Sequence, residues 1–373
     1  MTSKVTEKSR YFGLDFLRTI AILTVLLAHA SLFFPFKNYI THAALPTLGL
    51  VGVEIFFGLS GYLIGSILLK RSYGLDVFYI KRFMKILPPY LIFLFIIYLT
   101  STPGGSFSTF LAHLFFLHNF YPDMAGYFPV SWSLSIEFWF YLLIPLLFYF
   151  SPSMSSKKIG IFTRVLAALL LITLGRVIYV LALEPNWEFG IHRFIPVRMD
   201  ALLFGVLAAI INIRYPTWQK FILRPSVIFT SFAAAIGVLV SFGYAYFMIT
   251  INQLTTFKMF GTTIIGISVL VALVVVQNKM LRESRFGLFN LIVRFISKIS
   301  YSLYLTHLFV YLFIENMLGN GWAQFIIAFS TSIVMSWIVY ITVESTSMKV
   351  SNAFVQAAHS RNKTSTRAGV PTE

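Results

Sequence analysis

The chain has 373 residues, of which 58% are hydrophobic and only 11% are charged. Soluble domains carry about 25% charged residues, so this composition excludes an ordinary soluble protein and indicates a membrane protein. The formal net charge is +16, but the basic residues lie in short clusters between apolar runs, and we therefore expect no nucleic-acid partner. Because the chain has no cysteine, disulfides, thiol nucleophiles and cysteine metal sites are excluded, and we expect no metal site.

Ten apolar runs are long enough to cross a membrane at about 20 residues per helix. They lie near residues 13–35, 47–69, 83–101, 130–150, 161–182, 196–213, 226–248, 257–276, 298–318 and 321–344. We expect an all-α, polytopic membrane protein with a single integral domain over residues 1–349 and a short, basic, disordered cytoplasmic tail over residues 350–373. The apolar run 105–120 is too short to span, and we interpret it as an interfacial or re-entrant segment.

The basic residues predict the orientation. With a cytoplasmic N-terminus, 23 of the 29 Lys and Arg fall in cytoplasmic segments, five fall outside, and Arg18 lies within the first helix. The positive-inside rule then places both chain ends in the cytoplasm, in agreement with an even number of helices.

The first helix, within LDFLRTIAILTVLLAHA (residues 14–30), carries three ionisable side chains. Intramembrane charges are costly and usually face a bundle interior or a wet cavity, so each is a candidate for function. Arg18 and His29 share one helix face, about 16 Å apart along the axis. Asp15 stands three residues before Arg18, the spacing of a helical ion pair. The alternatives are a snorkelling, ion-paired Arg18 and a His29 that only bonds a neighbouring helix.

The second and fourth helices each carry a carboxylate. Glu54 lies in GLVGVEIFFGLSGYLIGSILL (residues 49–69) and Glu137 in SWSLSIEFWFYLLIPLL (residues 131–147). At 1.5 Å per residue, both carboxylates and His29 lie roughly 8–12 Å below the outer boundary. This common depth predicts a shared cavity that holds a base and its orienting carboxylates. Gly61 and Gly65 form a G-x-x-x-G signal for close helix packing.

A basic cluster marks the third helix. In FYIKRFMKILPPYL (residues 78–91), Lys81, Arg82 and Lys85 precede a pair of prolines. Such a cluster either snorkels and sets orientation or binds phosphate at the cytoplasmic face.

Polar residues in later helices complete the candidates. Arg198 and Asp200, in PVRMDALLFG, are read as an interfacial ion pair or a substrate contact at the mouth of the sixth helix. In SKISYSLYLTHLFVY (residues 297–311), Ser300, Tyr304 and His307 form one stripe whose default role is hydrogen bonding between helices. The candidate substrate-site residues are Asp15, Ser133, Arg198, Asp200, Tyr304 and His307.

These segments, in this order, resemble the acyltransferase-3 family of ten-helix bacterial membrane acyltransferases. The first-helix stretch is similar to the family signature of a basic residue and a histidine, and GVEIFFGLSGYLIG, KRFMKILPPY, WSLSIEFWFYLLIPL and ISYSLYLTH are similar to later landmarks. The similarity runs from about residue 12 to about residue 345. The sequence departs from the family at YITVESTSMK, which lacks the proline that often follows its glutamate, and in having no extra extracytoplasmic hydrolase-like domain.

The resemblance implies an enzyme of the bacterial inner membrane that transfers an acyl group, commonly acetyl, from acyl-CoA to a carbohydrate hydroxyl. Acceptors in the family include lipopolysaccharide, exopolysaccharide and peptidoglycan. His29 would be the essential base, oriented by Glu54 or Glu137, and Arg18 with Lys81, Arg82 and Lys85 would bind the acetyl-CoA donor. No tightly bound cofactor is expected, and an acyl-histidine intermediate remains an alternative to general-base catalysis.

Two other classes of protein fit the intramembrane charges. A glycolipid transporter or flippase would move its substrate without forming an ester. A non-catalytic membrane scaffold would tolerate the loss of His29 while still requiring its packing glycines.

Overall fold

A computed structural model describes residues 12–34, 43–70, 74–100, 106–124, 126–149, 157–248, 250–278 and 287–368. Over these ranges the secondary structure is helical, with no strand. Ten helices among the described residues are long and apolar enough to cross a membrane, which confirms the predicted fold class. A helix satisfies its own backbone hydrogen bonds, so it is the natural way for so apolar a chain to cross lipid.

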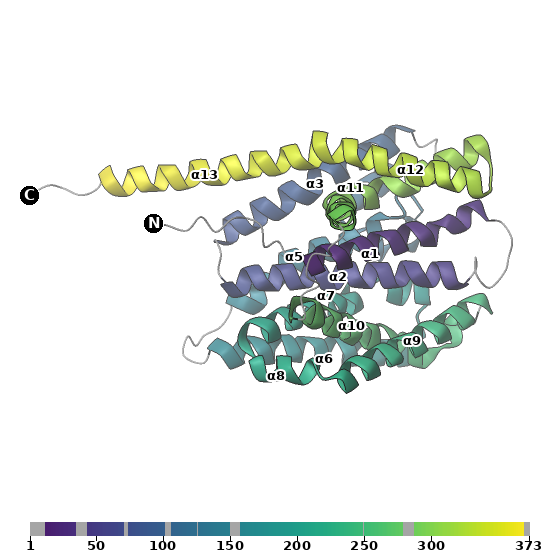
Figure 1. The fold of residues 1–373 in the computed structure, drawn as a ribbon, viewed down its shortest axis with the longest axis horizontal. Coiled ribbons are helices and arrows are strands. Elements are labelled where there is room, and N and C mark those ends of the chain that lie inside the picture. Colours follow the sequence, from purple (N-terminus) through teal and green to yellow (C-terminus); the bar gives the residue numbers. More distant parts are fainter. Residues whose placement is uncertain are drawn as a thin grey trace, which may run out of the picture.

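The candidate spanning helices are α1 (Phe12–His29), α2 (Leu45–Lys70), α3 (Leu75–Thr100), α5 (Ser131–Tyr149), α6 (Lys157–Leu183), α7 (Ile195–Arg214), α9 (Pro225–Phe247), α10 (Thr255–Asn278), α11 (Gly287–Leu318) and α12 (Trp322–Val339). Two short helices, α4 (Phe107–Leu114) and α8 (Pro216–Ile222), lie between them in the sequence, and Figure 1 labels α8. After α12 a wide π-helical turn, Tyr340–Glu344, leads directly into α13 (Ser345–Ala368).

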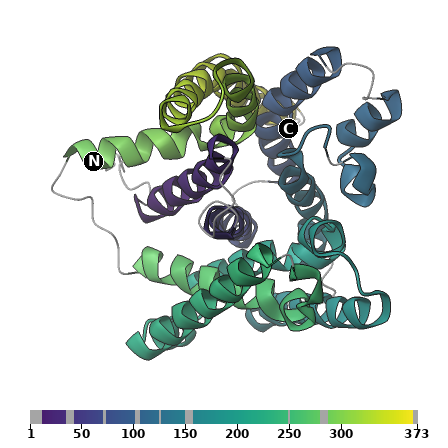
Figure 2. The ribbon, with the colours of Figure 1, turned by 90° about the vertical axis from the view of Figure 1, so that its right-hand side faces the viewer.

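The pair α2 and α7 forms the centre of the bundle, and Figure 2 shows α2 end-on near the middle of the molecule. A Cβ atom on Gly61 would lie 1.8 Å from the carbonyl oxygen of Leu202, and one on Gly205 would lie 2.0 Å from that of Gly58. These distances leave no room for a side chain at either position. Because glycine has none, the two backbones can approach closely. The packing role predicted for Gly61 is therefore confirmed.

Two helices begin earlier than their apolar runs predict. Helix α3 begins at Leu75 and α11 at Gly287, so the cluster Lys81, Arg82 and Lys85 lies within a helix. Hydropathy detects only the apolar part of a helix, whereas Lys and Arg are good helix formers and extend it beyond that part. Within the run 105–120, the described residues form the eight-residue α4 and a short 3₁₀ helix at His118–Phe120.

The C-terminal segment differs from the expected disordered tail. Helix α13 continues to Ala368, and Figure 1 shows it extending beyond the bundle on the side where α1 begins. Residues 350–368 contain neither Gly nor Pro, so nothing in the local sequence breaks the helix that enters from α12. Residues 369–373 lie outside the described part of the chain.

Candidate functional site

Two cavities hold candidate site residues. The first is bordered by α1, α2, α3, α5 and α11, and we call it the cationic cavity. With the solvent at its mouth it encloses about 770 Å³. Three basic side chains line it: Arg18 from α1, and Arg82 and Lys85 from α3. Lys81, the third basic residue of the cluster on α3, does not line it. Three cations around one hollow make a site for an anion such as phosphate.

Arg18 is held where α1 meets α11. Its Nη1 lies 3.7 Å from Asp15 Oδ1, which is the ion pair expected from their spacing. The same nitrogen donates to Ser297 Oγ at 3.5 Å, and Ser297 in turn donates to Asp15 at 2.7 Å. Asp15 therefore positions the arginine and does not line either cavity.

Glu137 lies in the cationic cavity, bonded to two hydroxyls. Ser60 Oγ donates to Glu137 Oε1 at 2.9 Å, and Tyr141 Oη donates to Oε2 at 2.8 Å. Lys85 lies within electrostatic range of this carboxylate and of the buried Glu344, which accepts a 2.7 Å bond from Ser302. The cavity thus holds opposite charges side by side, with the basic residues in excess.

The second cavity contains His29, and we call it the histidine cavity. It lies at the C-terminal end of α1 and the N-terminal ends of α2 and α5, and encloses about 960 Å³ with its adjoining solvent. Aromatic side chains, including Trp132, Trp187 and Tyr246, form much of its wall beside the charged Glu188 and Arg193. A wall of aromatic rings with a few polar groups is typical of a site for a partly polar ligand.

The hydrogen bonds of His29 define its tautomer. Nδ1 lies 3.0 Å from the carbonyl oxygen of Val25, which can only accept, so Nδ1 carries the proton. His307 makes the same bond to Leu303 at 3.1 Å, and its Nε2 then accepts from His29 Nδ1 at 3.4 Å. In the neutral ring the Nε2 of His29 keeps a lone pair, and within the described chain no hydrogen bond occupies it. A lone pair on a cavity-lining imidazole can accept a proton.

The segment before α7 supplies the charged groups of the histidine cavity. Arg193 Nε donates to Glu188 Oε1 at 2.7 Å across the turn Trp187–His192. Burial opposes ionisation of Glu188, but His192 and Arg193 outweigh it and hold the pKa of this carboxyl below its usual value. Burial lowers the pKa of His192 to about 4, opposed by Glu188 and reinforced by Arg198 and Arg193. His192 is therefore neutral at neutral pH.

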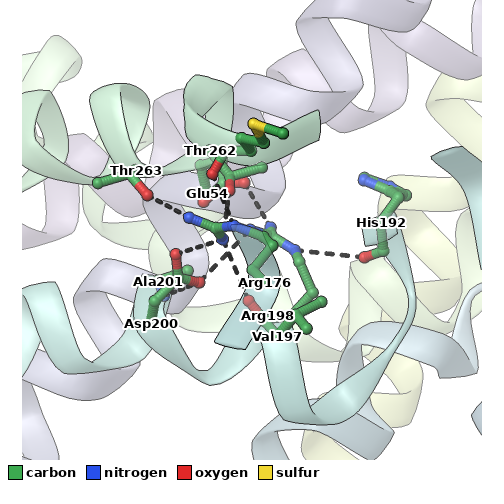
Figure 3. A network of polar contacts seen from close by, with 10 residues as sticks. Glu54, Arg176, His192, Val197, Arg198, Asp200, Ala201, Thr262 and Thr263 are labelled. Atoms are coloured by element: carbon green, nitrogen blue, oxygen red, sulfur yellow. Dashed lines mark hydrogen bonds and ion pairs between the residues drawn. The ribbon is translucent and has the colours of Figure 1, made fainter. Parts of the chain in front are cut away.

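A third group of charges is buried between α2, α6, α7 and α10 and lines neither cavity (Figure 3). Arg198 Nη2 pairs with Glu54 Oε1, and Arg198 Nη1 lies 3.8 Å from Asp200. Arg176 Nη1 pairs with the other oxygen of Asp200 at 2.7 Å. All four side chains are essentially inaccessible to solvent.

Further donors complete this buried ionic network. Arg176 Nε donates to the carbonyl of Met259 at 2.9 Å, and Nη1 donates to Thr262 at 2.8 Å. Nη2 donates to the hydroxyl of Thr263, as Figure 3 shows. Buried charges persist when partners and hydrogen bonds compensate their lost hydration. We interpret this network as structural.

The structure therefore separates residues that the sequence grouped. Arg18, Arg82, Lys85, Glu137 and Ser133 line the cationic cavity, whereas His29 lines the histidine cavity. Neither Glu54 nor Glu137 hydrogen-bonds His29, and the predicted shared cavity is not formed. Arg198 and Asp200 form the expected ion pair at 3.8 Å, but both are buried within the bundle and line neither cavity. Helix depth predicts height along the membrane normal, but not which neighbour a side chain faces.

Sequence reasoning missed three contributors. Arg176 is one of the five basic residues that the predicted orientation places outside, and it supplies one of the two cations of the ionic network. Glu188 and Arg193 lie in the segment that connects α6 and α7. Charged residues are common in connecting segments, so their charge alone did not indicate a functional site. Their spacing of five residues across a turn beside Trp187 was the only available indication.

Comparison with known proteins shows that residues 11–341 match a family model described as an acyltransferase domain. The chain is 27% identical over 342 residues to a Staphylococcus aureus (strain COL) protein provisionally named O-acetyltransferase SACOL0978, covering 84% of this chain and 53% of that protein. It is 26% identical to O-acetyltransferase OatA of Staphylococcus aureus (strain NCTC 8325 / PS 47), over 83% of this chain and 52% of that protein.

A Bacillus subtilis (strain 168) protein provisionally named peptidoglycan O-acetyltransferase YrhL is 33% identical over 169 residues, which is 38% of this chain and 24% of that protein. The chain thus spans about half the length of the long relatives it matches. No solved structure matches the chain. The family model covers most of a chain with ten candidate spanning helices, and this multi-pass membrane protein belongs to the acyltransferase-3 family.

Proposed function

We propose that this protein is an O-acetyltransferase of a bacterial inner membrane that moves an acetyl group from acetyl-CoA to a hydroxyl of a cell-envelope carbohydrate. Family membership supports acyl transfer, and relatives named O-acetyltransferases support an oxygen acceptor. The observation that carries the proposal is the Nε2 of His29, which accepts no hydrogen bond from the described residues and lies in a cavity next to a cationic one.

The cationic cavity is the proposed donor site. Coenzyme A carries phosphates at one end and its thioester at the other, so it needs basic groups some distance from the reacting carbon. Arg18, Arg82 and Lys85 supply such groups, and α1 places His29 about 16 Å further along the axis. The flexible pantetheine arm can bridge that distance.

The histidine cavity is the proposed acceptor site. Sugars present apolar faces and hydroxyl edges, which suit the rings of Trp132 and Trp187 and the polar groups of Glu188 and Arg193. The carboxylate that lines the cavity together with His29 is Glu188, which replaces Glu54 and Glu137 as the acidic neighbour of the proposed base.

In the proposed step, Nε2 of His29 takes the proton of the acceptor hydroxyl while the hydroxyl oxygen attacks the thioester carbonyl carbon. The carbon–sulfur bond breaks, and the leaving thiolate takes the proton back from the imidazolium. His307 and the carbonyl of Val25 hold the ring in the tautomer that this requires.

The test is a transfer assay on the full chain in lipid nanodiscs, with acetyl-CoA and candidate envelope glycans. Because the chain has no cysteine, a thiol reagent reads the released coenzyme A without background from the protein, and NMR reads the new ester. We expect His29→Ala to lower the rate by about 10²- to 10⁴-fold, the usual contribution of a general base.

A matched control is His113→Ala, which removes a buried histidine that lines neither cavity. The control should keep its activity if the effect is specific to His29. Ester formation at the wild-type rate by correctly folded His29→Ala protein would overturn the assignment, and movement of glycan without ester would favour a transporter.

A further inference from the structure

The two cavities share a wall. Val53 and Tyr304 line both of them. On α2, Leu50 lies only in the histidine cavity and Phe56 only in the cationic cavity, so the helix passes from one to the other at Val53. On α5, Trp132 lines the histidine cavity and the next residue, Ser133, lines the cationic cavity. Helices α2 and α5 therefore both pass from one cavity to the other along a boundary on which Tyr304 of α11 also lies.

Both sides of this wall are fixed in place. Tyr304 Oη and Ser133 Oγ form a 2.6 Å hydrogen bond between α11 and α5. The ring of Tyr304 has Phe56 on one side, with centroids 6.1 Å apart, and His307 on the other at 5.9 Å. The residue after Val53 is Glu54, which the pair with Arg198 holds against α7. The packing leaves little freedom to widen the gap.

We propose that Val53 and Tyr304 form the aperture through which the acyl group reaches His29, and that the size of Val53 limits the length of that group. This inference rests on the proposed function. A donor whose phosphates bind Arg82 and Lys85 reaches the histidine cavity only past the shared wall. Of the two residues that line both cavities, Tyr304 is held by its hydrogen bond to Ser133, so the two methyl groups of Val53 are proposed to set the clearance.

The physical argument is one of volume. A rigid apolar opening discriminates between chains that differ by one methylene by about 10- to 200-fold. An acetyl group ends one carbon beyond its carbonyl, whereas a butyryl group carries two further methylenes. Removing the methyl groups of Val53 creates room for a longer chain at the point where the acyl group is proposed to pass, and it removes no polar group.

The experiment compares acetyl-CoA with butyryl-CoA as donors to one glycan. We expect Val53→Ala to raise the butyryl-to-acetyl rate ratio by at least about tenfold. Leu50→Ala is the matched control, because it removes apolar volume on the same helix but within the histidine cavity only. An unchanged ratio in Val53→Ala, or an equal rise in Leu50→Ala, would overturn the aperture.

The result also separates this inference from the proposed function. If the wild-type protein transfers no acetyl group, the function itself fails. If it transfers acetyl and the ratio does not respond, only the aperture fails.

A second measurement covers the case in which Val53→Ala does not fold. The cysteine-free chain allows Val53→Cys and Leu50→Cys to be labelled alone in sealed vesicles with a small, impermeant thiol reagent. A shared wall predicts that reagent from either side reaches position 53, whereas position 50 reacts from one side only. Labelling of both positions from the same single side would contradict the aperture.

Discussion

Two groups of charges lie inside this bundle, and they differ in what surrounds them. In the ionic network, Glu54, Arg198, Asp200 and Arg176 pair with one another and are closed off from solvent. In the cationic cavity, Arg18, Arg82 and Lys85 border an open hollow, and among the described residues that line it Glu137 is the one carboxylate. The residue types are the same in both places.

The difference shows that an intramembrane charge is not by itself a sign of chemistry. Buried charges that are paired with fixed partners connect neighbouring helices, as Arg198 of α7 does by its ion pair with Glu54 of α2. Charges that face a cavity can exchange water for a ligand. The following predictions test this division.

The largest effect is expected from breaking the ionic network. Glu54→Ala leaves Arg198 buried beside the remaining charges, and we expect the free energy of unfolding to fall by about 3–5 kcal/mol. Thermal or denaturant unfolding in detergent measures the change. Glu137→Ala is the comparison, because this carboxylate lines a cavity and its loss should cost less. Equal destabilisation by both variants would remove the distinction between the two groups.

An intermediate effect is expected from the cationic cavity. A hydrogen bond to a charged group contributes about 1.5–3 kcal/mol, so Arg82→Ala and Lys85→Ala should each weaken coenzyme A binding about 10- to 100-fold with little loss of stability. Isothermal titration with the purified protein measures the Kd. Lys81→Ala is the control, since Lys81 belongs to the same cluster but does not line the cavity. Equal weakening in Lys81→Ala would show that surface charge, and not the cavity, attracts the donor.

The smallest effect concerns His192, which connects the ionic network to the histidine cavity: its carbonyl accepts a 3.3 Å bond from Arg198, and the residue lines that cavity. Its pKa of about 4 in the folded protein lies below the value of 6.5 expected when unfolded. As the pH falls from 7 to 5, His192 becomes protonated in the unfolded state but stays neutral in the folded state. The free energy of unfolding therefore decreases. The drop in melting temperature should be smaller in His192→Gln. An identical drop in both proteins would show that His192 does not contribute.

The sequence predicted the elements well because each depends on local pattern. Runs of about 20 apolar residues predicted the ten candidate spanning helices, and the three-residue spacing predicted the Asp15–Arg18 ion pair. It misjudged the starts of α3 and α11 and the helical continuation of α13, because apolarity marks the membrane-buried part of a helix and not its ends.

The amino-acid sequence by itself determined the membrane class, the helix count and the placement of Arg18 and His29 on one face, since these follow from composition, the length of a crossing and the pitch of a helix. Only the tertiary structure decided the partners of the candidate residues. Glu54 forms an ion pair with Arg198, Glu137 accepts hydrogen bonds from Ser60 and Tyr141, and His29 bonds His307. The rise per residue gives height along a helix. The rotation of each helix and the identity of its neighbours depend on close contacts such as those of Gly61 and Gly205, between segments far apart in the chain.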